Sequence, residues 1–194
     1  NMQTITKLET NEIILNKSKF ITVITPIKEK QEIENILKNI KNKYKDATHY
    51  CFAYIIEGEE KCDDNGEPSG TAGMPILKVL KINNLTNILC IVIRYFGGIK
   101  LGAGGLIRAY STSASEALNK CETKEIKNGF TITITFPYHN LKQIDHLLKN
   151  IKIDKSYENE ITYTFDIYEE DYLKIKNILE TYSVIINKKP VKLT

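Results

Sequence analysis

The sequence predicts an α+β protein made of two α/β-sandwich domains, and three observations predict it. Runs rich in β-branched residues alternate with amphipathic segments of helical spacing. A polar stretch over residues 120–129 ends in Asn128-Gly129, a turn signal that suits a domain boundary. The pattern beyond it follows the order β-α-β-β-α-β, which is the ferredoxin-like plan. We therefore expect an N-terminal domain over residues 1–126 and a C-terminal domain over residues 130–194.

The first 56 residues predict two strands, a helix and a third strand. Residues 4–15 and 18–27 are rich in isoleucine and threonine and predict strands, with Thr10-Asn11 as a turn. Residues 29–44 place apolar side chains at helical spacing among lysines and glutamates, so we expect an amphipathic surface helix there. Residues 47–56 predict a buried strand with His49 near its start.

A polar segment over residues 57–73 follows, and we expect it to be a loop. Asn65-Gly66 is a turn signal, and Pro68 is incompatible with a helix interior or a central strand. Loops of this length are usually either functional or disordered. A short helix from Met74 to Leu80 is predicted after it.

The most apolar run of the chain, Asn87–Phe96, predicts a central strand. It leads directly into a glycine cluster between Gly97 and Gly105, and we expect a helix from about Gly105 to Lys120. Small residues in this helix would let it approach a sheet closely. In the C-terminal domain we expect strands over 130–136, 152–157, 161–168 and 184–192, and helices over 139–150 and 171–182.

Composition narrows the class of protein. The 42% hydrophobic and 26% charged residues are those of an ordinary globular chain, and no apolar run reaches the roughly 18 residues of a transmembrane helix. No signal-peptide pattern opens the sequence, so we expect a cytoplasmic protein without a membrane partner. The four cysteines are far apart and predict reduced thiols, and we expect neither a metal nor a cofactor. A net charge of +3 is too small to identify a nucleic-acid-binding protein by itself.

The glycine cluster is the strongest candidate for a binding site. Five of the ten glycines lie in it, and the only two arginines, against 25 lysines, flank it. Glycines let a ligand approach the backbone, and a helix N-terminus favours an anion. The segment matches neither a Walker loop nor a dinucleotide fingerprint. Aromatic rings beside cations could stack on bases, although Phe96 fits a buried core equally well. The predicted anion- or nucleic-acid-binding residues are Arg94, Tyr95, Gly98, Lys100, Gly102, Gly104, Gly105, Arg108 and Tyr110.

The polar loop is the candidate for the opposite wall of a cleft. Its predicted wall residues are Asp64, Glu67, Ser69, Gly70 and Thr71. Turn chemistry with solvated acids explains its carboxylates better than a metal site does. His49, Asp64 and Glu67 could alternatively serve as acid–base groups of an enzyme, whereas a lone histidine at a strand end is more often structural.

Two long motifs carry a family resemblance. Residues 64–75 read DNGEPSGTAGMP and residues 94–110 read RYFGGIKLGAGGLIRAY. Together with Ala47-Thr48-His49 they resemble the signature of the IMPACT family, with the second domain typical of its YigZ-like bacterial members. The resemblance implies an N-terminal domain similar to the second domain of a small-subunit ribosomal protein, and a C-terminal domain similar to the fifth domain of elongation factor G. Eukaryotic relatives act in translational control, through regions this chain largely lacks.

These observations give three functional hypotheses. The first is a non-catalytic protein associated with RNA, the ribosome or translation factors, which regulates translation. The second is an enzyme acting on a phosphorylated or carboxylated small molecule in the cleft between the Asp64–Gly73 and Arg94–Arg108 segments. The third is a protein-interaction module, which would expose an apolar patch and bind no anion.

Overall fold

The strand β6 (Ile88–Tyr95) is the centre of the N-terminal part of the chain. In the computed structural model, which describes residues 1–194, the first seven residues of β6 are all buried. It is the middle strand of an antiparallel five-stranded sheet with the order β2-β3-β6-β4-β5. The central strand predicted over Asn87–Phe96 is therefore confirmed.

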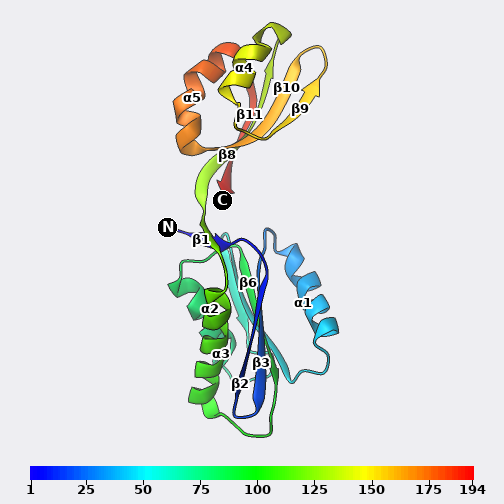
Figure 1. Ribbon diagram of the computed structural model, residues 1–194, viewed down its shortest axis with the longest axis vertical. Coiled ribbons are helices and arrows are strands. Elements are labelled where there is room, and N and C mark those ends of the chain that lie inside the picture. The colour runs from blue at the N-terminus through cyan, green and yellow to red at the C-terminus, as the bar shows by residue number, and fades with distance from the viewer. The chain divides into compact units, whose positions relative to one another are not determined.

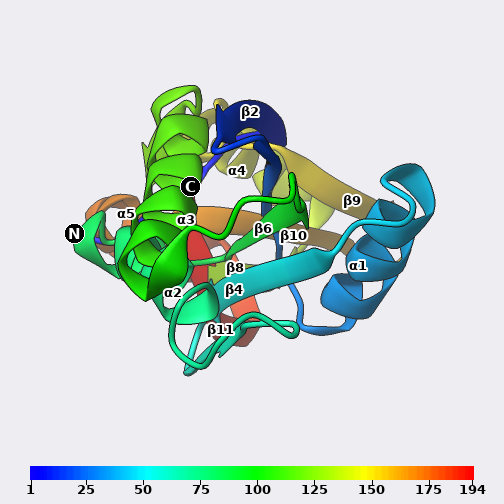
Figure 2. The same cartoon turned by 90° about the horizontal axis from the view of Figure 1, so that it is seen from below.

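Three helices cover the two faces of this sheet. Helices α2 and α3 lie on one face and α1 lies on the other (Figures 1 and 2). Apolar side chains fill both layers, because successive residues of a strand point to opposite faces. The sheet is thus buried on both sides, which explains the unbroken apolar run of β6. The elements of this part are β1 (Gln3–Ile5), β2 (Glu9–Leu15), β3 (Ser18–Pro26), α1 (Gln31–Lys43), β4 (His49–Ile56), β5 (Glu59–Asp63), α2 (Gly73–Ile82), α3 (Gly102–Asn119) and β7 (Thr123–Glu125).

The first hairpin differs from the expectation. Thr10-Asn11 is not a turn but lies inside β2, which pairs with β3 from Glu9 opposite Ile24 to Leu15 opposite Ser18. The turn is Asn16-Lys17, where φ is 45° and 64°. The type I′ form of a two-residue hairpin loop requires positive φ at both positions, and asparagine tolerates it well. Pairing of the two strands outweighs the local turn preference of Thr10-Asn11.

Two further boundaries also differ. The segment 57–73 is not wholly a loop, because Glu59–Asp63 forms the edge strand β5 against β4. Helix α3 begins at Gly102, not near Gly105. Glycine disfavours a helix by about 1 kcal/mol relative to alanine. Packing of the buried face of α3 on the sheet therefore outweighs the local cost of three glycines in its first turn.

The C-terminal part contains a second sheet with two helices on one of its faces. Its elements are β8 (Lys127–Phe136), the 3₁₀ turn η1 (Tyr138–Asn140), α4 (Leu141–Leu147), β9 (Ile153–Tyr157), β10 (Ile161–Tyr168), α5 (Glu169–Tyr182) and β11 (Val184–Leu193). The antiparallel sheet has the order β11-β8-β10-β9. Ile144 of α4 and Leu179 of α5 are fully buried against it. Threonines occupy the opposite face of its central strands, where Thr133 and Thr164 are hydrogen-bonded at 3.0 Å.

The chain divides into two units, Asn1–Glu125 and Ile126–Thr194. Both mix helices with antiparallel sheets, so the protein has the predicted α+β class. None of its helices combines the length and the hydrophobicity needed to cross a membrane.

Candidate functional site

A buried carboxylate, Glu67, is the centre of a charged cluster between the sheet and α3. Its side chain is 4% exposed. Arg94 Nη1 donates to both carboxylate oxygens, at 3.0 and 2.8 Å, and the Tyr110 hydroxyl donates to Oε2 at 2.5 Å. A buried charge is tolerated only when it is paired and hydrogen-bonded, and these donors meet that requirement. Glu67 is therefore a structural anion.

His49 completes the cluster from the start of β4, where it pairs with Arg94 of β6. Its Nε2 lies 3.1 Å from Glu67 Oε1, and its Nδ1 lies 2.8 Å from the Asn65 carbonyl oxygen. A carbonyl and a carboxylate can only accept hydrogen bonds. A ring with a proton on both nitrogens satisfies both contacts.

The Tyr110 hydroxyl and the Cys51 thiol beside the cluster are both held in their protonated, unreactive forms. Burial raises the pKa of Tyr110 far above its ordinary range, with the neighbouring Cys51 and Glu67 adding to the effect. Burial also raises the pKa of Cys51 to about 12. The Cys51 thiol lies 3.4 Å from the Tyr110 hydroxyl oxygen and 3.2 Å from the Asp64 carbonyl oxygen. Because only the thiolate is nucleophilic, Cys51 is a packing residue.

Asp64 holds the loop before α2 together. Its carboxylate accepts the backbone N–H groups of Gly70, Ala72 and Gly73 at 2.9, 3.2 and 2.8 Å. Burial acts to raise the pKa of Asp64, but the three N–H donors outweigh it and the pKa is lowered. The oxygens of Asp64 are thus occupied by the loop itself, as those of Glu67 are by Arg94 and Tyr110. Of the three proposed acid–base groups, only His49 is not a carboxylate held in this way.

The glycine stretch is anchored at its beginning. A Cβ on Gly97 would lie 2.0 Å from the Lys17 carbonyl oxygen, so only glycine fits against the β2–β3 turn. The Gly97 N–H donates to Ser18 Oγ at 3.2 Å. At the other end, Gly102 begins α3 with φ of +73°, a conformation that side chains disfavour. The loop is thereby fixed at both ends.

The start of α3 is an open, positively charged surface. No side chain caps its N–H groups, and its first turn contains no acidic residue. Lys100 is exposed beside it. Arg108 lies in the second turn, but its side chain reaches back until Nη1 is 3.4 Å from where a Gly104 Cβ would be. We call Lys100, Arg108 and the free N–H groups of residues 102–105 the basic rim.

Beside the basic rim is a cavity of about 370 Å³. It is formed by the loop before α2, the end of β6 and the first turns of α3. Its lining residues are Thr48, His49, Glu67, Pro68, Arg94, Phe96, Lys100, Leu101, Gly102, Ala103 and Leu106. The structure therefore brings the loop segment and the glycine stretch together around one hollow. The apolar side chains that line it are Pro68, Phe96, Leu101, Ala103 and Leu106.

Several predicted contact residues are not available to an anion or a base. Arg94 is 6% exposed and neutralised by Glu67, so it is not a free anion contact. Tyr110 is fully buried and cannot stack on a base. Tyr95 packs in the α1 layer, on the other face of the sheet, where its hydroxyl donates to the Lys45 carbonyl. Strand alternation explains the difference, because Arg94 and Tyr95 must point to opposite faces.

The remaining loop residues also lie outside the cavity. Ser69 and Gly70 are exposed, whereas Thr71 is buried and its hydroxyl donates to the Pro68 carbonyl at 2.6 Å. Gly98 is exposed in the stretch before α3. The aromatic residue that does line the cavity is Phe96, 46% exposed. Its position at the end of β6, directly before the glycines, was the available signal for an uncovered ring.

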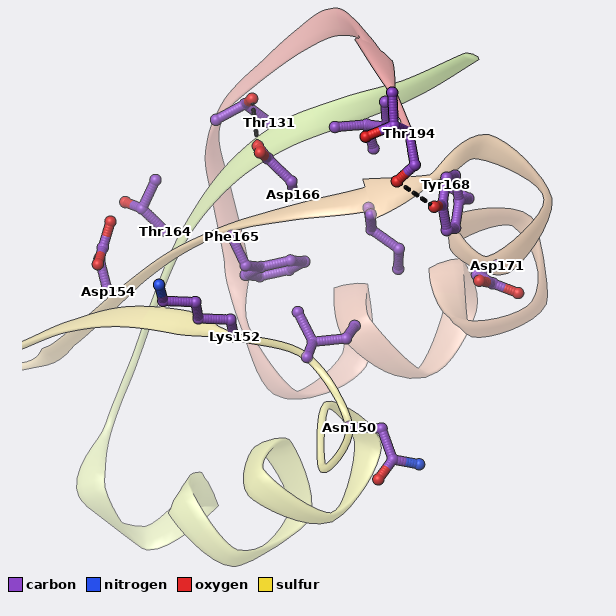
Figure 3. Close-up of a pocket in the computed structure, with 13 residues that line it drawn as sticks. Thr131, Asn150, Lys152, Asp154, Thr164, Phe165, Asp166, Tyr168, Asp171 and Thr194 are labelled. Atoms are coloured by element: carbon purple, nitrogen blue, oxygen red, sulfur yellow. Dashed lines mark hydrogen bonds between the residues drawn. The ribbon is translucent and has the colours of Figure 1, made fainter. Parts of the chain in front are cut away.

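A larger hollow of about 650 Å³ lies in the C-terminal unit, along β10 (Figure 3). Asp154, Asp166 and Asp171 line it, against the single cation Lys152. Thr131 donates to Asp166, and the Tyr168 hydroxyl donates to the Thr194 carbonyl oxygen. This excess of carboxylates repels a phosphate, so the hollow does not suit the anionic ligand predicted from the sequence.

Comparisons with known proteins agree on one family. The Impact N-terminal domain matches residues 16–118. The IMPACT family member YvyE of Bacillus subtilis is 41% identical over 170 residues, which are 86% of this chain and 76% of that protein. The family member YigZ of Escherichia coli is 32% identical over 139 residues, or 69% and 68% of the two chains. A crystal structure described as a hypothetical protein is 26% identical with a TM-score of 0.66, and the match covers 95% of each chain. The chain belongs to the IMPACT family.

Proposed function

We propose that this protein is a non-catalytic RNA-binding protein that acts in the regulation of translation, on the ribosome or on free RNA, and that the basic rim contacts the phosphate backbone. One observation carries the proposal. Exposed Lys100 and Arg108 flank the uncapped start of α3, which has no acidic residue in its first turn. Free N–H groups, the helix dipole and two cations all favour a phosphate at the same place.

Family membership supports the biological context, since eukaryotic relatives of this chain act in translational control. The charge distribution supports the site. Residues 1–129 contain 18 basic and 15 acidic side chains, whereas residues 130–194 contain nine of each. The excess positive charge thus belongs to the part of the chain that contains the basic rim. A cytoplasmic location fits this function.

Salt-dependent binding of a fluorescently labelled single-stranded RNA tests the proposal. Counterion release gives a slope of about −0.7 in log K against log salt for each phosphate contact on a single strand. The double variant Lys100→Ala/Arg108→Ala should therefore weaken binding and reduce the slope by about 1.4. The control removes two exposed lysines of the same unit, Lys28→Ala/Lys38→Ala. A flat salt response in the wild type, or equal slopes in the two double variants, would contradict the proposal.

The variant at Lys100 and Arg108 is preferable to one at Arg94. Removal of Arg94 leaves the buried Glu67 carboxylate without its cation, which costs about 3–5 kcal/mol and confounds binding with folding. The same pair of double variants can be compared for recovery of crosslinked RNA and ribosomal material from cells. Equal recovery would place the contact away from the basic rim.

A second candidate function is an enzyme acting on a phosphorylated or carboxylated small molecule. The observation that favours it is His49, whose Nε2 contacts Glu67 at the wall of a cavity large enough for a small ligand. Its weakness is that Asp64 and Glu67 are engaged in structural contacts. An ordered phosphate compound in contact with both the Gly104 backbone and His49, together with turnover that His49→Gln abolishes, would favour it.

A further inference from the structure

We infer that the cavity beside α3 receives one unpaired base of a single-stranded RNA, with Phe96 as the ring on which the base packs. This inference rests on the proposed function, because it assumes that RNA is the ligand of the basic rim. It adds two properties that phosphate contacts do not give, namely a preference for single strands and a dependence on the base itself.

The first argument is the character of the cavity. Pro68, Phe96, Leu101 and Leu106 line it, and the charged side chains at its floor hardly reach its surface. Glu67 and Arg94 are 4% and 6% exposed and neutralise each other. A volume of about 370 Å³ is far larger than a single ion needs, since a water molecule occupies about 30 Å³. The hollow therefore suits a flat, largely apolar group.

The second argument is that Phe96 is exposed but held in a fixed position. The residue is 46% exposed, yet neighbouring groups contact its ring and its backbone. The Arg94 guanidinium carbon lies 5.3 Å from the ring centroid, and the Phe96 N–H donates to Thr48 Oγ1 at 2.9 Å. Arg94 is itself held by Glu67. A rigid aromatic ring loses little conformational entropy on binding, which is the property that stacking platforms use.

The third argument is that the basic rim directly adjoins the cavity. Lys100 belongs to both the cavity wall and the basic rim, and Gly102 and Ala103 contribute to both as well. A ligand that fills the cavity with an apolar group and places an anion at its mouth is, in chemical terms, a nucleotide. A base in a duplex is paired and stacked, and its extrusion costs a few kcal/mol, so an already unpaired base is favoured. An apolar peptide side chain would fill the same hollow but has no use for the rim cations.

Binding of one labelled RNA sequence, as a single strand and as a blunt duplex, tests the inference. The single strand should bind more tightly. Phe96→Ala should weaken single-strand binding by about 5- to 150-fold, the range expected for loss of one base–aromatic contact, and should leave the salt slope unchanged. Phe96→Trp should retain binding. The matched control is Tyr157→Ala, which removes a similarly exposed ring, 55% exposed, from the other unit.

An RNA with abasic sugars gives a readout that needs no protein variant, and it should bind the wild type as weakly as intact RNA binds Phe96→Ala. The inference is overturned if Phe96→Ala and the abasic RNA both bind normally while Lys100→Ala/Arg108→Ala still binds weakly. In that case the proposed RNA contact survives without base insertion. If neither form of RNA binds, or binding ignores the rim cations, the proposed function itself fails and the inference with it.

Discussion

Substitution of the buried carboxylate tests whether the Glu67 cluster holds the site together. Glu67→Gln keeps the side-chain shape but removes the charge that faces Arg94 and His49. Breaking a buried ion pair from one side costs about 3–5 kcal/mol, because the remaining charge stays buried without compensation. We expect a loss of that size in the free energy of unfolding of the N-terminal unit.

Native-state hydrogen exchange of the β6 amides measures this loss, since the most buried strand exchanges only through the largest openings of its unit. The control is Glu60→Gln, which removes the partner of Lys81 from an ion pair of 3.0 Å whose side chains are 46% and 54% exposed. An exposed pair contributes about 0–1 kcal/mol. If Glu67→Gln cost no more than Glu60→Gln, the cluster would not be the support of the cavity wall.

Three further predictions concern the loops and the thiols. The pKa of Asp64 is lowered in the folded state, so its carboxylate stabilises the loop at pH values above its ordinary pKa of 3.8, and this effect is lost as the pH falls through the folded-state pKa. Asp64→Asn should therefore reduce the free energy of unfolding by about 1–2 kcal/mol at pH 7 and by less at pH 3, as measured by urea unfolding. Gly97→Ala should destabilise by about 1–3 kcal/mol because of its close backbone contact, whereas Gly104→Ala should stabilise α3 by up to about 1 kcal/mol in the same assay; equal effects would contradict the geometry. Cys51 and Cys90 should resist iodoacetamide at pH 8 until urea is added, because burial raises both pKa values, and rapid labelling of native protein, seen by mass spectrometry, would refute this.

Periodicity predicted most of the fold, because burial on a sheet or a helix face imposes a repeat on the sequence. The unbroken apolar run of β6 and the helical spacing of α1 are local signals of that kind. The hairpin turn was misplaced because Thr10-Asn11 is a good turn dipeptide, and only pairing with β3 keeps it extended. The same limit applied to β5, whose polar residues form an edge strand that gains its stability from β4.

The sequence predicts that the loop segment and the glycine stretch lie side by side, but it does not predict how their side chains are placed. The two flanking arginines and the glycines correctly indicated a segment with unusual backbone requirements. Arg94 and Arg108 looked equivalent in the sequence, yet one is buried on Glu67 and the other is exposed. Their difference depends on strand phase and on a carboxylate 27 residues away, which no local pattern encodes. The exposure of Phe96 is not encoded locally for the same reason, since it depends on where β6 leaves the sheet.

The most direct test of the central claim is a titration of ¹⁵N-labelled protein with a short single-stranded RNA, followed by NMR. We predict that the largest amide shift changes occur at Phe96, Lys100 and residues 102–105, and that Lys100→Ala/Arg108→Ala removes them. Changes confined to the C-terminal unit, or spread evenly over exposed lysines while RNA binds, would contradict a site at the start of α3.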